Sequence, residues 1–176
     1  MNRPNCRQFR SAWHGLGCGG RVAQIQVGRT VNVSASTETR ASLLLAIQVE
    51  DADAFELAVR SAFVAGLPRD LADLFTAALS IPWHTRHEDL VSALQKMKSP
   101  ASVDALFAAA ITQHAYLEYD EFFGLARRCT WALADIGTPL AREKLDELAA
   151  NANPTIAAYA RKRLDRWDDE IGRKNA

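Results

Sequence analysis

Apolar residues recur with a helical period along most of the chain after residue 40. Following Pro68, the third, sixth, seventh, tenth and eleventh positions are Leu71, Leu74, Phe75, Ala78 and Leu79. The same five offsets after Pro100 hold Val103, Leu106, Phe107, Ala110 and Ile111. Residues spaced three and four apart lie on one face of a helix. Because proline is well tolerated in the first turn of a helix, each of these prolines is expected to open one.

The segments that precede the prolines carry a matching set of apolar positions. Ten, six and three residues before Pro68, Pro100 and Pro139 stand Ala58, Ala62 and Ala65, then Leu90, Leu94 and Met97, then Cys129, Leu133 and Ile136. Each unit is therefore predicted to be two helices joined by a tight turn. Gly66 and Gly137 suit helix ends that need a left-handed residue. Ser99, Thr138 and Asn153 are favourable N-caps.

The third unit matches this pattern less well. After Pro139, Leu145 and Ala149 fit the expected offsets, but Arg142 and Asp146 occupy two positions that are apolar elsewhere. The packing register of this hairpin is therefore left open. A last helix is expected after Pro154, with apolar residues at Ala157, Ala160 and Leu164.

The units repeat at a distance typical of stacked helix pairs. Pro68 and Pro100 are 32 residues apart, and Pro100 and Pro139 are 39 apart. One such pair cannot bury its apolar face alone, so neighbouring pairs stack into a solenoid. The predicted fold is all-α: a right-handed α-solenoid of about three hairpins over residues 38–171, with terminal helices at 38–48 and 154–171 and a short disordered tail at 172–176.

The third unit and the helix after it resemble bacterial HEAT-like repeats, of the kind also found in phycobilisome lyases. The resemblance is carried by Ala-Leu-x-x-Ile-Gly-x-Pro at 132–139, Leu-x-x-Leu-Ala at 145–149, Pro-x-Ile at 154–156 and Ala-x-x-x-Leu at 160–164. It covers residues 123–165 and is looser elsewhere. It implies a scaffold that binds proteins, and some small bacterial members are suspected immunity proteins against toxins. Other members act on bilin chromophores or alkylated DNA.

The zero net charge conceals an asymmetry between the two parts of the chain. Residues 1–40 carry six arginines and one acid, a net charge of +5, and the remainder carries 15 basic against 20 acidic residues, a net charge of −5. An acidic body argues weakly against nucleic-acid binding. Residues 1–37 have no helical period and are predicted to form a disordered basic tail. The alternatives are an organelle transit peptide and a basic arm for an acidic partner.

The cysteine count and the hydropathy pattern point to a cytoplasmic protein. The three cysteines, Cys6, Cys18 and Cys129, are too few and too scattered for a disulfide framework, which suggests a reducing compartment. No apolar run approaches the length of a membrane-spanning helix, and glycines and arginines interrupt any signal-peptide core. No motif calls for a cofactor.

One polar cluster precedes the helix that ends near Pro100. It contains Trp83, His84, Arg86 and His87. The two histidines are three residues apart, so one helical turn could bring both rings to one face. A metal site would need further ligands, and none is obvious. His87 also lies where the neighbouring units have Phe55 and Ala126, which favours a packed histidine at the start of the apolar stripe. Contact with a partner is the second interpretation.

The second cluster lies where the longer repeat has seven extra residues. It contains Tyr116, Glu118, Tyr119, Asp120 and Glu121. Seven residues equal two helical turns, about 10 Å of overhang, and the cluster would lie on this overhang or on the loop before it. Insertions in repeat proteins are often functional. Tyrosines surrounded by acids could bind a basic partner, or the tyrosines could stack on the previous repeat.

Arg127, Arg128 and Trp131 follow on the next helix, with Trp131 off the main apolar stripe. The chain shows no Ser-His-Asp order, glycine-rich phosphate loop or Cys-x-x-Cys pair. We therefore predict a module that is not an enzyme and that occludes one protein partner, in an immunity or regulatory role. The alternative is an enzyme, or a protein that handles nucleic acid or a chromophore, acting through a concave groove. The predicted partner-binding residues are Trp83, His84, Arg86, His87, Tyr116, Glu118, Tyr119, Asp120, Glu121, Arg127, Arg128 and Trp131.

Overall fold

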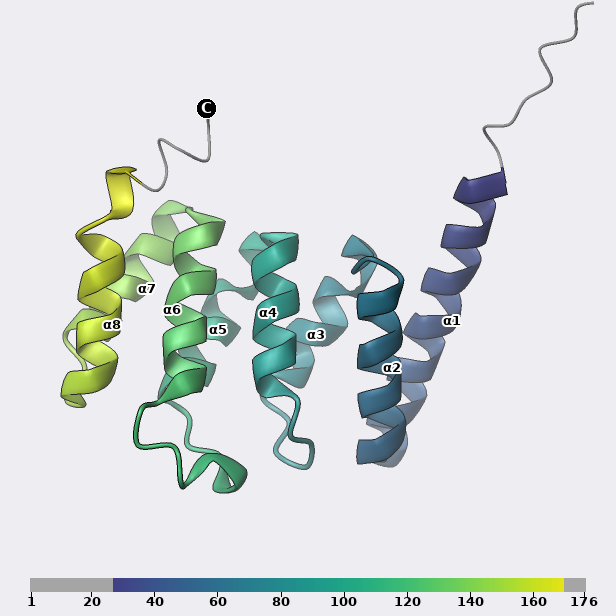
Figure 1. Ribbon diagram of the computed structural model, residues 1–176, viewed down its shortest axis with the longest axis horizontal. Helices are drawn as coiled ribbons and strands as arrows, with labels where there is room; N and C mark the ends of the chain where they lie inside the picture. The colour runs from purple at the N-terminus through teal and green to yellow at the C-terminus, as the bar shows by residue number, and fades with distance from the viewer. Residues whose placement is uncertain (1–26, 170–176) are drawn as a thin grey trace, which may run out of the picture.

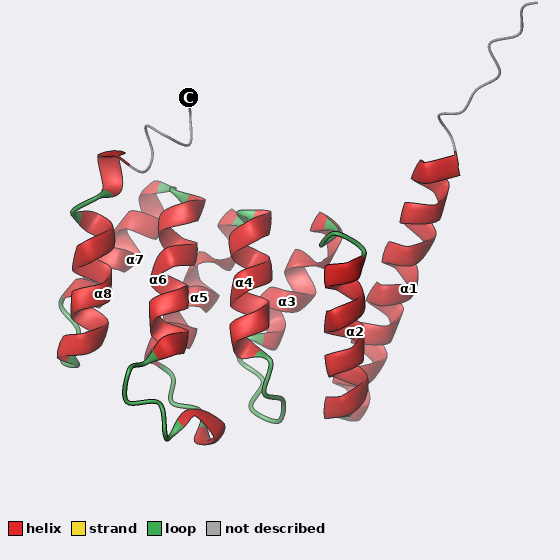
Figure 2. Cartoon of the chain, viewed as in Figure 1, coloured by secondary structure: helices red, strands yellow, loops and turns green. Residues whose placement is uncertain are grey.

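The computed structural model describes residues 27–169, with side chains placed from residue 36 onward. Its α-helices are α1 (Val27–Val49), α2 (Ala52–Val64), α3 (Ala72–Ala78), α4 (His87–Met97), α5 (Val103–Ile111), α6 (Gly124–Ile136), α7 (Pro139–Ala149) and α8 (Pro154–Leu164). Three short 3₁₀ helices lie between them: η1 (Arg69–Leu71), η2 (Pro100–Ser102) and η3 (Ala115–Leu117). No strand occurs in residues 27–169, so the all-helical prediction is confirmed for this part of the chain (Figure 2).

The helices form two layers. Figure 1 shows α2, α4, α6 and α8 side by side in the front layer, with α1, α3, α5 and α7 behind them. Consecutive helices pack as pairs, α1 on α2, α3 on α4, α5 on α6 and α7 on α8, while α4 packs on α6 and α6 on α8. Each helix pair therefore buries one face within the pair and another against the next pair.

The predicted apolar positions supply the core between the layers. Leu71, Phe75, Leu94, Leu106 and Leu133 are all fully buried. Burying a side chain of this size contributes about 1.5–3 kcal/mol relative to leaving it exposed. The prediction is wrong for Ile111, the last residue of α5, whose side chain is 46% exposed. The periodic pattern thus identifies the core well within the helices and less well at their ends.

The register of the third hairpin differs from that of the first two. After Pro68 and Pro100 the chain passes through the 3₁₀ helices η1 and η2 before the α-helix begins, whereas α7 begins at Pro139 itself. A 3₁₀ helix has 3.0 residues per turn and an α-helix 3.6, so equal offsets from the proline fall on different faces. In α7 the buried residues are Ala141, Leu145 and Leu148. The charged residues at positions 142 and 146 consequently point to solvent without disturbing the core.

The first helix is longer than predicted. The expected boundary lay at residue 38, but α1 begins at Val27 and so includes the last part of the predicted tail. Its second half is tied to the next hairpin, because Arg40 pairs with Asp73 at 2.6 Å and Ser36 donates to Asp70 at 2.7 Å. The predicted tail at 1–26 and the predicted end at 172–176 lie outside the described residues.

The α1–α2 pair carries an exposed apolar groove at its end of the stack. Leu45, Val49, Leu57 and Val64 are between 59% and 87% exposed and line a hollow of about 720 Å³. We call this the α1–α2 groove. Within residues 27–169, none of the helices combines the length and the apolar character needed to cross a membrane.

Side-chain caps fix two of the three turns for which they were predicted. Thr138 Oγ1 accepts the backbone N–H of Ala141 at 3.2 Å, and Asn153 Oδ1 accepts the N–H of Thr155 at 2.9 Å. The side chain of Ser99 makes no capping hydrogen bond, so this predicted cap is not formed. Gly137 ends α6 with φ of 69°, the left-handed conformation expected from its position.

These caps lead to a stability prediction. Thr138→Ala and Asn153→Ala should each lower the free energy of unfolding by about 1 kcal/mol, because an exposed helix N–H loses its partner. Ser99→Ala is the matched control and should change stability by much less. Urea denaturation followed by circular dichroism measures all three, and an equal loss in the control would contradict the assignment of the caps.

Candidate functional site

The two polar clusters meet at one end of the molecule. The α3–α4 connection, residues 79–86, and the α5–α6 loop, residues 112–123, lie next to each other below the front layer in Figure 1. The ring of His87 at the start of α4 lies 3.7 Å, between centroids, from the ring of His114 in the α5–α6 loop. Its Nδ1 is 3.1 Å from the hydroxyl of Tyr116. Clusters about 30 residues apart in sequence thus form one structural unit.

A column of rings joins three parts of the chain at this end. Phe55 of α2 stacks on His84 at 4.6 Å, and His84 stacks on His87 at 4.3 Å. His87 then contacts His114 and, at 5.7 Å, Tyr116. We call these five residues the histidine stack. Because the rings come from α2, from residues 84–87 around the start of α4 and from the α5–α6 loop, the stack fixes these elements relative to one another.

The hydrogen bonds of His84 require a neutral imidazole, and those of His87 fit one. The backbone N–H of Arg86 donates to Nδ1 of His84 at 3.1 Å, so the proton of this ring is on Nε2, which donates to the carbonyl of Ala78 at 2.9 Å. His87 donates from Nε2 to the carbonyl of Ile81 at 3.0 Å, and its Nδ1 accepts from Tyr116. Each nitrogen of both rings therefore has a partner within the protein.

Burial keeps the stack uncharged. It lowers the pKa of His87 to about 3, with a further contribution from the neighbouring histidines, and it lowers the pKa of His84 and of His114. It also raises the pKa of Tyr116 to about 12. Among the described residues, no three His, Cys, Asp or Glu side chains are grouped to hold a metal ion. The stack is thus a packing element in which all the nitrogens of His84 and His87 are hydrogen-bonded, whereas the buried Nε2 of His114 has no partner.

The first predicted contact cluster is therefore mostly core. His84 is 1% exposed and His87 is fully buried, so neither ring can reach a partner, and the assignment of both to a binding surface is corrected. Trp83 is half-buried, with its ring edge-on to Phe55 at 5.5 Å. Arg86 forms ion pairs with Glu56 of α2 and, at 3.5 Å, with Asp89 of α4. The interpretation of the cluster as packing at the start of a helix is confirmed.

The α5–α6 loop contains the seven extra residues as a folded connection, not as a longer helix. The prediction of a helical overhang is wrong, since α6 begins only at Gly124. The loop alternative is confirmed: the chain turns through η3, and Asp120 then accepts the backbone N–H groups of Phe122 at 3.1 Å and of Gly124 at 2.5 Å. Tyr159 of α8 donates its hydroxyl to the carbonyl of Phe122 at 2.8 Å. Hydrogen bonds from within and from α8 therefore hold the loop.

The start of α6 also requires a close approach between helices. A Cβ at Gly124 would lie 3.0 Å from Oδ2 of Asp120 and 3.2 Å from Oε1 of Glu88 on α4. These distances leave no room for a side chain without displacing a carboxylate. Phe123, just before it, has φ of 50°, a left-handed conformation that is strained for a residue with a side chain. The contacts of the loop therefore outweigh the unfavourable backbone conformation of Phe123.

The outer surface of the loop is aromatic and acidic. Tyr119 is 81% exposed and Phe122 is 75% exposed, while Glu118 and Glu121 are exposed beside them. Of the predicted contact residues, Tyr119, Glu118 and Glu121 are exposed to solvent. Tyr116 and Asp120 are half-buried and form hydrogen bonds within the protein. Phe122 was missed, because its place at the edge of the next helical pattern suggested that it was packed. We call Glu118, Tyr119, Glu121 and Phe122 the loop surface.

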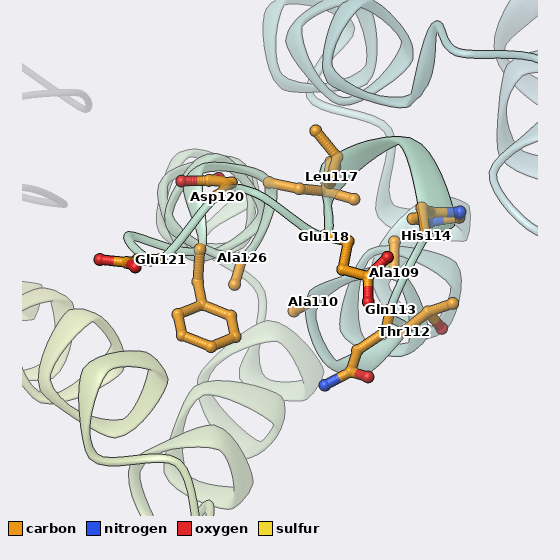
Figure 3. Close-up of a pocket in the computed structure, with 12 residues that line it drawn as sticks. Ala109, Ala110, Thr112, Gln113, His114, Leu117, Glu118, Asp120, Glu121 and Ala126 are labelled. Atoms are coloured by element: carbon orange, nitrogen blue, oxygen red, sulfur yellow. The ribbon is translucent and has the colours of Figure 1, made fainter.

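A cavity of about 400 Å³ lies behind the loop surface, between the end of α5, the loop and the start of α6 (Figure 3). Its lining residues are Ala109, Ala110, Thr112, Gln113, His114, Leu117, Glu118, Asp120, Glu121, Phe123, Leu125 and Ala126. Figure 3 shows Glu118 between Ala110 and His114, and Glu121 projecting outward on the other side. All of its walls come from one stretch of the chain, residues 109–126, and the helical period of the sequence does not show how this stretch folds back on itself.

The third group of predicted contact residues lies on α6 and is partly engaged within the protein. Arg128 pairs with Glu88 of α4 at 3.3 Å. The guanidinium of Arg163 on α8 lies 3.9 Å from the ring centroid of Trp131, which is 45% exposed. Arg127 is exposed. Two of the three predicted α6 residues, Arg128 and Trp131, are therefore already in contact with neighbouring helices.

The neutral histidines predict a specific pH dependence of stability. In the unfolded chain a histidine takes up a proton near its ordinary pKa of 6.5, whereas His87 in the folded protein does so only near pH 3. Protons therefore bind preferentially to the unfolded state in this interval, and the free energy of unfolding should fall as the pH drops below about 6.5. His87→Phe keeps a ring in the stack but removes this titration, so it should make the decline shallower.

Chemical denaturation between pH 8 and pH 5 measures this effect above the range in which most carboxylates titrate. Phe55→Leu is the control, since it removes a ring of the same stack without removing a titratable group. It should lower stability by a similar amount at every pH. If His87→Phe kept the pH dependence of the unsubstituted protein, the linkage to His87 would be wrong.

A second prediction concerns the shape of the loop. Asp120→Ala should lower the free energy of unfolding by about 1 kcal/mol, because two backbone N–H groups at the start of α6 lose their acceptor. It should also speed amide hydrogen exchange at Phe122 and Gly124. Glu121→Ala, at the adjacent exposed position, is the control and should leave both measurements nearly unchanged. Unaltered exchange in Asp120→Ala would show that the carboxylate does not hold the loop.

Comparisons with known proteins add no identity to this geometry. No family model matches the chain, and neither a similar curated protein nor a similar solved structure was found. The function must therefore be inferred from the surfaces of the molecule itself.

Proposed function

We propose that this protein is a HEAT-like α-solenoid interaction module that binds a basic segment of a protein partner through the loop surface. The specific version that we favour is occlusion of the partner's basic site, in an immunity or regulatory role. The proposal combines the repeat pattern of the sequence with the position and chemistry of the α5–α6 loop.

The arrangement of the helices supports the solenoid part of the proposal. Helix pairs follow one another along the chain, and each pair packs on the next through the same layer. In repeat proteins of this kind, the units form a rigid scaffold, and insertions in single units often carry the binding function. The loop of residues 112–123 is such an insertion, and in Figure 1 it projects beyond the end of the front layer.

The exposure of two aromatic side chains on a held loop is the observation that carries the binding function. Tyr119 and Phe122 are exposed by more than 70%. Their loop is fixed by Asp120 and by the hydroxyl of Tyr159. Aromatic residues are enriched in interfaces and frequent among the residues that dominate binding energy. A loop that is already ordered loses little conformational entropy when it binds.

The charge of the loop surface supports a basic partner. Glu118 and Glu121 flank the aromatic pair, and the described part of the α5–α6 loop contains no lysine or arginine. Opposite charge on a partner accelerates association and orients the complex. A basic groove for nucleic acid lacks comparable support, because Arg86 and Arg128 are paired with the acids Glu56 and Glu88.

The test uses the full chain and a random peptide library displayed on phage. Selected peptides should be enriched in lysine and arginine, and their affinity should fall about ten-fold or more in the double variant Tyr119→Ser and Phe122→Ser, as expected for the loss of aromatic hot-spot residues. Fluorescence anisotropy with labelled synthetic peptides measures the affinities.

The α1–α2 groove provides the matched control. Leu57→Ser with Val64→Ser removes two apolar side chains of similar exposure at the other end of the molecule, and should leave the affinity unchanged. The proposal fails if no peptide is enriched, or if the selected peptides bind the loop variant as tightly as the unsubstituted protein.

A further inference from the structure

The cavity behind the loop surface has an apolar interior. Ala109, Ala110, Leu125 and Ala126 are each less than 5% exposed and form its deep walls. Four of the twelve lining residues are small or aliphatic core residues, and Leu117 and Phe123 of the loop add further apolar surface. The volume of about 400 Å³ lies at the small end of the range for ligand sites in proteins. The cavity thus has room for one side chain between mostly apolar walls, and Nε2 of His114, one of the lining residues, is buried without a hydrogen-bond partner.

The mouth of the cavity is negatively charged. The exposed side chains on its rim include Glu118 and Glu121, and none of the twelve lining residues is lysine or arginine. His114 adds no positive charge, since burial lowers its pKa. The third carboxylate, that of Asp120, is engaged by two backbone N–H groups. The two glutamates are therefore the groups left to meet charge on an incoming chain.

We propose that this cavity receives one aliphatic side chain, of leucine or methionine size, from a basic segment of the partner. Lysine or arginine residues next to that side chain contact Glu118 and Glu121 at the rim. The inference rests on the proposed function, which it sharpens into a recognition rule: an aliphatic residue flanked by basic residues. Mostly apolar walls below an acidic rim match this chemistry, since the charged heads remain at the solvent edge while the aliphatic group leaves water.

The rule distinguishes the cavity from the exposed aromatic pair. Tyr119 and Phe122 lie outside, where they can pack on many kinds of chain, and provide contact area without selecting one side chain. The cavity selects by size and the rim by charge. Specificity of this kind arises from differences in affinity between competing segments.

Four short synthetic peptides test the rule with the full chain. The first has the central sequence Lys-Leu-Arg, the second replaces leucine by serine, the third replaces both basic residues by glutamine, and the fourth replaces them by glutamate. Titrations followed by nitrogen–proton correlation spectra report both the affinity and the place of binding. The first peptide should shift the backbone amides of Ala110, Gln113 and Leu125, and each of the other three should bind about ten-fold more weakly or not at all.

Two protein variants complete the experiment. Glu118→Gln with Glu121→Gln changes only exposed side chains and should weaken the Lys-Leu-Arg peptide about ten-fold, while the glutamine peptide is nearly unaffected. Ala110→Leu places three more carbon atoms in the cavity and should reduce the preference for leucine over serine. Because the comparison of peptides needs no substitution in the protein, the rule stays testable even if Ala110→Leu does not fold.

The outcomes separate the cavity from the proposed function. Equal binding of the leucine and serine peptides, or shifts confined to the α1–α2 groove, would overturn the cavity assignment. Library-selected peptides could lose affinity in the Tyr119→Ser and Phe122→Ser variant but bind the Ala110→Leu variant normally. In that case the loop surface remains the proposed binding site, and the cavity rule is rejected. If the loop variant binds selected peptides normally, the proposed function itself falls.

Discussion

The histidine stack is the interaction that holds together the end of the molecule formed by the α3–α4 connection and the α5–α6 loop. Helices of a repeat protein pack mainly on their neighbours, so their connecting loops have few contacts of their own. Here, rings from α2, from the start of α4 and from the α5–α6 loop lie in one column, with centroid distances between 3.7 and 5.7 Å. Imidazole suits this role because the nitrogens of His84 and His87 form hydrogen bonds at the ring edges while the ring faces stack. The arrangement requires neutral rings, since adjacent positive charges would repel one another without solvent to screen them.

The proposed binding surface depends on a loop that is fixed in place. Tyr116 inserts toward His87 on the inner side of the loop, and Asp120 and Tyr159 hold the outer part. With the backbone held from both sides, the aromatic residues Tyr119 and Phe122 face solvent in a defined arrangement. The same construction opens the cavity beneath them, because η3 and the following turn carry the chain over the ends of α5 and α6 without filling the space between. The histidine stack, the α5–α6 loop and the cavity therefore depend on the same set of contacts.

Charged side chains are paired between the helices but not among the residues that line the cavity. Along the α2, α4 and α6 layer, arginines meet glutamates of a neighbouring helix, as Arg86 meets Glu56 and Arg128 meets Glu88. Such partly exposed pairs contribute little stability, but they leave this layer without a strong field of either sign. At the loop, by contrast, Glu118 and Glu121 have no basic neighbour among the residues that line the cavity. These two glutamates lie at the end of the molecule where Tyr119 and Phe122 are exposed.

The sequence by itself determined the helices, most of their buried faces and the place of the insertion, because these follow from local periodicity, from prolines and from caps such as Thr138. It also indicated the packed role of His87, since that position is apolar in the other units. Only the tertiary structure decided which polar residues are accessible. His84 and His87 are buried because rings 30 residues away cover them, and Phe122 is exposed because the chain turns before α6 begins. The start of α1, the register of α7 and the cavity depended on tertiary contacts. The periodic pattern of apolar residues in a sequence does not report such contacts.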